Sequence, residues 1–161
     1  MKKPMKIALL VVAALLLQVT LLPAYIADPF QPDLLIILVV YLGLKSHHRL
    51  APLAAFGLGL LQDVFSGIYF GLSGFSFLCI FLVLSRLSDR LYTDNRLLLV
   101  MVVFLATVAG ALIDLVLLFI FSVAGGIYSS ILAAVLPQAL VNAFVASLLL
   151  NLPLRPAEEA P

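Results

Sequence analysis

Two aspartates lie inside long apolar runs of this sequence, where a carboxyl group is costly to bury. Asp63 stands near the end of one run and Asp114 lies within a later one. Two carboxyl groups that share a proton can activate water for peptide hydrolysis. The surrounding residues, LQDV and IDL, lack the motifs of intramembrane aspartyl peptidases, and Asp63 is expected nearer the outer surface than Asp114. We therefore predict no catalytic residue and no enzyme activity, and retain the peptidase only as an alternative.

Further polar side chains recur at helical spacing within the apolar runs. Asp114 shares a helix face with Thr107 and Gly110. Gln138 precedes Asn142 by one helical turn. We predict that such positions converge in an outward-facing polar pocket or in a docking groove for a partner helix. Interhelical hydrogen bonding alone, at roughly 1 kcal/mol a bond, is the alternative. The candidate residues are Gln18, Asp33, Gln62, Asp63, Asp114, Gln138 and Asn142.

The carboxyl groups of Asp114 and Asp33 are expected in different environments. No lysine or arginine is expected at the depth of Asp114, so its carboxyl group must be neutral or hydrogen-bonded to a neighbouring amide. Asp33 follows Pro32 at the start of an apolar segment, where a helix amino terminus favours a negative charge. We expect Asp33 at the outer interface, where starting a helix is a sufficient explanation for it.

The composition decides which elements can position these side chains. The chain is 65% hydrophobic and 11% charged, with a mean hydropathy of +1.25, which is too apolar for a water-soluble globule of 161 residues. Continuous apolar runs favour helices over a barrel, so the predicted fold class is all-α within a membrane. The single cysteine, Cys79, excludes an intramolecular disulfide, and a net charge of +1 argues against nucleic acid. We predict no cofactor, and the adjacent His47 and His48 do not indicate a metal site.

The cationic residues set the predicted threading. With six spans and a cytoplasmic amino terminus, every lysine and arginine falls on the inner side, as the positive-inside rule requires. We expect one transmembrane domain over residues 1–161, in a bacterial cytoplasmic membrane, with both termini cytoplasmic and a flexible tail at 153–161. The predicted spans are about 5–22, 33–44, 50–66, 71–88, 96–122 and 129–152. The cations are Lys2, Lys3, Lys6, Lys45, Arg49, Arg86, Arg90, Arg96 and Arg155.

Two of these segments have an alternative interpretation. The first could be a signal peptide, but its apolar run is long and small residues are poorly placed for cleavage. The second is shorter than the roughly 20 residues of a perpendicular span and could be re-entrant. A re-entrant path would bury Lys45 and Arg49 in hydrocarbon, so we prefer a short span in locally thinned lipid.

Two stretches of the chain resemble the MreD family of bacterial rod shape-determining membrane proteins. They are QPDLLIILVVYLGL at 31–44, and GLGLLQDVFSG at 57–67 followed by FGLS at 70–73. The resemblance covers roughly residues 31–90, and beyond that only length and hydropathy fit. The matching positions are Pro32, Asp33, Gln62, Asp63, Gly67 and Gly71.

The resemblance implies a non-enzymatic scaffold of the cell-elongation and peptidoglycan synthesis machinery. It implies binding to the single-span protein MreC and, through it, to the RodA glycosyltransferase, its penicillin-binding transpeptidase and MreB. It also implies a six-helix fold similar to the substrate-binding subunits of energy-coupling-factor vitamin transporters, and such a subunit is the main alternative function. Whether membrane lipid occupies the pocket, and whether the chain forms a homodimer, is left open.

Overall fold

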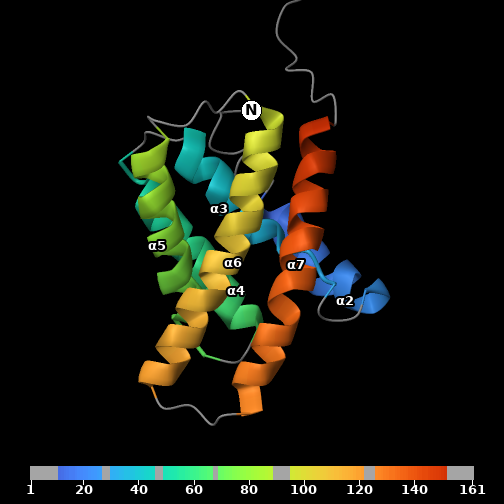
Figure 1. Ribbon diagram of the computed structural model, residues 1–161, viewed down its shortest axis with the longest axis vertical. Helices are drawn as coiled ribbons and strands as arrows, with labels where there is room; N and C mark the ends of the chain where they lie inside the picture. Colours follow the sequence, from blue (N-terminus) through green and yellow to red (C-terminus); the bar gives the residue numbers. More distant parts are fainter. Residues whose placement is uncertain are drawn as a thin grey trace, which may run out of the picture.

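A computed structural model describes residues 11–26, 30–45, 49–66, 69–88, 95–121 and 126–151. All regular secondary structure in these ranges is helical (Figure 1), which confirms the predicted all-α class for this part of the chain. Residues 11–16 are α-helical and lead into a π-helical turn. The elements are η1 (Leu17–Leu21), α2 (Leu22–Tyr25), α3 (Leu34–Lys45), α4 (Ala51–Ser66), α5 (Leu72–Leu87), α6 (Arg96–Ile120) and α7 (Gly126–Asn151). The predicted tail at 153–161 and the pair His47 and His48 lie outside the described residues.

Helices α6 and α7 are long and apolar enough to cross a bilayer. They include apolar spans of 25 and 24 residues, Arg96–Ile120 and Tyr128–Asn151. Helices α3, α4 and α5 have 12, 16 and 16 residues, fewer than the roughly 20 of a perpendicular span. These three occupy predicted apolar segments, but their crossing of the membrane, and the total of six spans, stay predictions.

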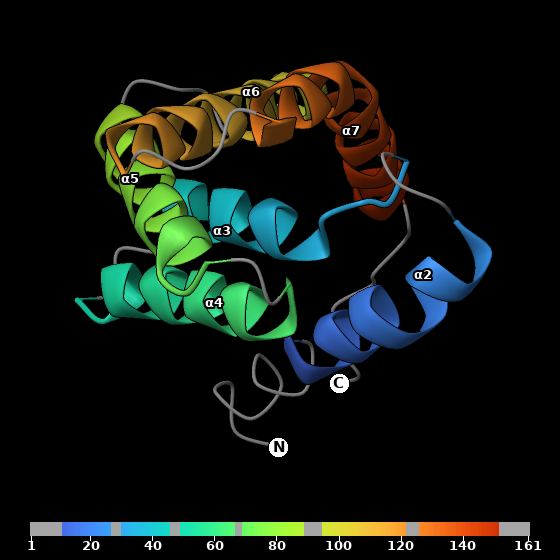
Figure 2. The same ribbon diagram turned by 90° about the horizontal axis from the view of Figure 1, so that it is seen from below.

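Helix α3 is the centre of the bundle. Seen from below, α4, α5, α6 and α7 are arranged around it (Figure 2). Its side chains Leu35, Val39 and Val40 are buried, with at most 1% of their surface exposed. The other residues of α3 are buried or partly buried, apart from the exposed Tyr41 and Lys45, which fits a central helix that is apolar over most of its surface.

The α4–α5 hairpin is packed backbone against backbone. A Cβ atom built at Gly59 would lie 2.5 Å from the Cα atom of Gly74 and closer still to the carbonyl oxygen of Ser73. Glycine at position 59 therefore permits an approach that no other residue allows. This close crossing fixes the end of α4 beside the start of α5, where the candidate polar residues gather.

Candidate functional site

The carboxylate of Asp33 is the hub of a buried polar network. Its Oδ1 accepts hydrogen bonds from the backbone N–H groups of Leu35 and Ile36, at 3.0 and 3.1 Å. Its Oδ2 accepts one from Gln62 Nε2 at 2.8 Å, and Gln18 Nε2 approaches Oδ1 at 3.4 Å. The first pair caps helix α3 in the expected manner. The two glutamines extend that cap into a connection between η1, α3 and α4.

Asn142 connects the same hub to the two long helices. Its Oδ1 accepts a 2.7 Å hydrogen bond from the backbone N–H of Asp33, and its Nδ2 donates to Thr107 Oγ1 at 3.0 Å. Thr107 in turn donates to the carbonyl oxygen of Val103, at 2.9 Å. Asn142 is completely buried. Each polar atom of its amide therefore has a partner, as a buried amide requires.

Asp33 is buried at the start of α3. It is 7% exposed, and Asn142 links it to Thr107, near the middle of α6. The neighbouring side chains satisfy the backbone at the start of α3, as buried irregular backbone requires. The place of Asp33 at the outer interface, and a short α3 span in thinned lipid, stay predictions.

Asp63 caps a helix from outside it. Helix α5 begins after Gly71, which has a φ of 98° and supplies no side-chain cap. The Asp63 carboxylate replaces that cap, because it accepts hydrogen bonds from the backbone N–H groups of Gly71, Ser73 and Gly74, at 2.8, 3.0 and 3.2 Å. Asp63 borders the predicted pocket, but its carboxylate is already occupied by these three donors.

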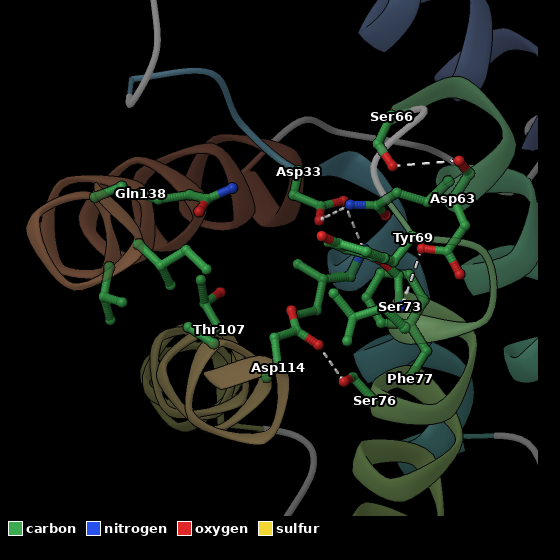
Figure 3. A pocket seen from close by; sticks show the side chains of 18 residues that line it. Asp33, Asp63, Ser66, Tyr69, Ser73, Ser76, Phe77, Thr107, Asp114 and Gln138 are labelled. Carbon is green, nitrogen blue, oxygen red and sulfur yellow. Dashed lines mark hydrogen bonds between the residues drawn. The ribbon is translucent and has the colours of Figure 1, made fainter. Parts of the chain in front are cut away.

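The described partner of Asp114 is a hydroxyl, whereas the prediction was a neutral carboxyl group or a hydrogen bond to a neighbouring amide. The hydroxyl of Ser76 donates to its Oδ1 and joins α5 to α6 (Figure 3). The prediction did not include Ser76. The available signal was its place three residues after Ser73, which puts two small polar side chains on one face of α5.

A cavity of about 240 Å³ lies among these groups, between α3, α4, α5, α6 and α7. Gln138 extends into it from α7, opposite Asp114 on α6 (Figure 3). Apolar side chains such as Ile36, Phe77 and Val135 line the rest of it. The structure thus brings five predicted residues to the cavity, whereas Gln18 and Asn142 join them through Asp33 without lining it. The polar lining residues include Asp33, Gln62, Asp63, Thr107, Asp114 and Gln138.

The carboxyl groups of Asp63 and Asp114 have different hydrogen-bond partners. Asp63 is held by backbone donors at the start of α5, while Asp114 is held by the hydroxyl of Ser76. Within the described ranges, no group of three or more His, Cys, Asp or Glu side chains is placed to hold a metal ion. The fold and the site define a class of protein, namely an apolar helical bundle whose polar interior joins its helices around a small cavity.

Comparison with known proteins assigns that class to a family. The family model of the rod shape-determining protein MreD matches residues 3–155. The chain therefore belongs to the MreD family, whose members are membrane proteins that determine rod shape. The match confirms the resemblance seen at residues 31–90 and extends it over α6 and α7, which carry Asp114, Gln138 and Asn142. No curated protein and no solved structure matched the chain.

Proposed function

We propose that this protein is a non-enzymatic scaffold of the cell-elongation machinery that binds MreC through its transmembrane bundle. The observation that carries the proposal is the family match, because it covers nearly the whole bundle. The Asp33 network supports it, since buried polar groups that join helices give a bundle one defined arrangement. RodA, its penicillin-binding transpeptidase and MreB would then be reached indirectly, through MreC.

The distribution of charge supports a cytoplasmic location for one end of the bundle. Lys45 ends α3, Arg86 lies in the last turn of α5, and Arg96 begins α6. Arg96 Nη1 donates a 3.1 Å hydrogen bond to Asn151 Oδ1 at the end of α7, so this helix also ends there. By the positive-inside rule this end faces the cytosol. Asp63 and the start of α5 then lie toward the exterior, at the opposite end.

Helix α7 offers the face that suits a single partner helix. Among the described elements it packs mainly against α6, with a smaller contact to α3. Only 17% of an apolar 18-residue stretch of α7 is buried within the protein, against 28% of the corresponding stretch of α6. Its outer face carries an unbroken i, i+4 ridge about 24 Å long, which a second helix can pack against by ridges-into-grooves. The ridge residues are Leu132, Leu136, Leu140, Phe144 and Leu148. We assign the transmembrane helix of MreC to this α7 ridge.

Co-purification in mild detergent tests both parts of this proposal. The double variant L136A/L140A removes two ridge side chains and should weaken MreC binding about thirtyfold, since each truncation costs on the order of 1 kcal/mol of packing. The control L105A/L112A makes the same change on the exposed face of α6 and should recover MreC normally. If only the α6 variant fails to recover MreC, then MreC binds α6 and not the α7 ridge. Failure of the unmodified protein to recover MreC would refute the scaffold.

The same purification examines the vitamin-transporter alternative. The cavity favours that alternative, but about 240 Å³ is below the roughly 300–1,000 Å³ of ordinary small-molecule pockets. Recovery of ATPase subunits in place of MreC and the elongation synthases would favour the transporter.

A further inference from the structure

Three polar side chains that line the cavity have hydrogen-bonding capacity left over. Gln62 donates its Nε2 to Asp33, which fixes the orientation of the amide and leaves Oε1 buried without a partner. Asp114 uses Oδ1 with Ser76, while Oδ2 has no hydrogen bond to any described residue. The Gln138 amide likewise has no hydrogen bond within the described residues, although its side chain extends into the cavity (Figure 3). A buried acceptor without a partner is costly, so Gln62 Oε1 indicates an occupant, and the half-buried Asp114 and Gln138 offer it further polar contacts.

Asp114 has fewer hydrogen-bond donors around it than the other two carboxyl groups that line the cavity. Asp33 and Asp63 each accept hydrogen bonds from several N–H donors, whereas the only described partner of Asp114 is one hydroxyl. Lys45 and Arg96 lie at the other end of the bundle. No described lysine or arginine lines the cavity. A cationic group of the occupant would donate to the carboxylate of Asp114 and balance its charge.

The unused acceptors match one kind of chemical group. A primary ammonium has three N–H donors and no acceptor. Gln62 Oε1 is buried without a partner, and Asp114 Oδ2 and Gln138 Oε1, also at the cavity, have no hydrogen bond to a described residue. A phosphate or carboxylate would be repelled by the carboxylates that border the cavity. A neutral hydroxyl would satisfy the hydrogen bonds but leave the charge of Asp114 unpaired.

We propose that the cavity binds a primary ammonium group, supplied by a phosphatidylethanolamine headgroup or by a free small amine. The volume of about 240 Å³ suits a group of this size rather than a whole lipid or a vitamin. The binding site depends on the contacts of α3 to α7 and is independent of whether MreC packs on the α7 ridge.

Native mass spectrometry of the purified full-length protein in detergent tests the proposal. The protein should retain phosphatidylethanolamine but not phosphatidylcholine, because the trimethylated headgroup keeps the positive charge and lacks N–H donors. If free ethanolamine at millimolar concentration displaces the lipid, a soluble amine is sufficient for binding. If the lipid is retained despite free ethanolamine, the occupant is the lipid headgroup. Equal retention of both lipids, or of neither lipid with no ethanolamine binding, would overturn the proposal.

Two substitutions with opposite expected signs separate this site from general lipid binding. D114N preserves the shape of the side chain and removes its charge, so ammonium binding should weaken about tenfold. Q138E adds a negative charge and should strengthen it several-fold. D94N removes one carboxylate from the sequence between α5 and α6 and is the matched control, with binding unchanged. Wild-type binding by D114N, or weaker binding by Q138E in a protein that elutes as a folded monodisperse peak, would refute the assignment.

Discussion

Replacing Asn142 with alanine should destabilise the bundle more than any other loss of a single amide side chain. The change removes the acceptor of the 2.7 Å bond from the Asp33 backbone N–H, which is then buried and unpaired. An unsatisfied buried donor costs about 1–3 kcal/mol. Loss of the 3.0 Å bond to Thr107 adds roughly 0.6 kcal/mol, the average for interhelical hydrogen bonds in a membrane protein. The expected loss in the free energy of unfolding is therefore about 2–4 kcal/mol.

Reversible unfolding by sodium dodecyl sulfate in mixed micelles measures this loss. N151A is the matched control, because Asn151 is an exposed asparagine on the same helix whose side chain bonds, among the described residues, the exposed Arg96. Its loss should stay within about 0.5 kcal/mol. If N142A and N151A unfold at the same denaturant fraction, the connection from Asp33 to the long helices contributes nothing to stability and the reasoning fails.

Three further predictions follow from the described contacts and from the charge distribution. G59A should cost about 2 kcal/mol, because the new Cβ meets the backbone of Gly74, whereas G57A, with no atom within 4 Å, should unfold like the wild type or at slightly higher denaturant. D63A leaves three backbone donors at the start of α5 without their acceptor and should cost about 2 kcal/mol; a protein as stable as the wild type would refute the capping role. A reporter fused after Lys45 should be cytoplasmic, and an extracytoplasmic signal would overturn the orientation.

The sequence predicted the helices well because their positions depend on local apolar runs. The proposed span at 96–122 corresponds to α6 at 96–120, and the one at 129–152 to most of α7. The burial of Asp33 among other helices was not predictable in the same way. A positive-inside count reports only which side a loop occupies, and it treats each apolar run as spanning the whole bilayer. The start of a short helix can instead lie deep in the bundle when neighbouring helices supply its polar partners, as Asn142 and Gln62 do here.

The sequence shows which residues in the apolar runs are polar, but it does not show which of them form hydrogen bonds with each other. Helical spacing placed Asp114 on a polar face, but the partner comes from Ser76 on α5, and the spacing within one helix carries no information about its neighbour. Asp63 was interpreted as a member of a pocket, and it does line the cavity. Its capping of α5 depends on the left-handed turn at Gly71, and helical spacing within α4 gives no information about that turn.

Helix α7 contributes to both proposed binding sites, with one site on each of two opposite faces. Gln138 and Asn142 face inward toward the cavity and α3, while Leu136 and Leu140 face outward. Because Asn142 donates to Thr107 and accepts from Asp33, the position of α7 relative to α3 depends strongly on this one side chain. A loosened α7 would move Gln138 and the ridge together, whereas truncation of the ridge leaves the inner face intact. N142A should therefore weaken both ammonium binding and MreC recovery, and L136A/L140A should weaken MreC recovery alone. Ammonium binding that survives in N142A would show that the cavity keeps its shape without the Asp33 connection.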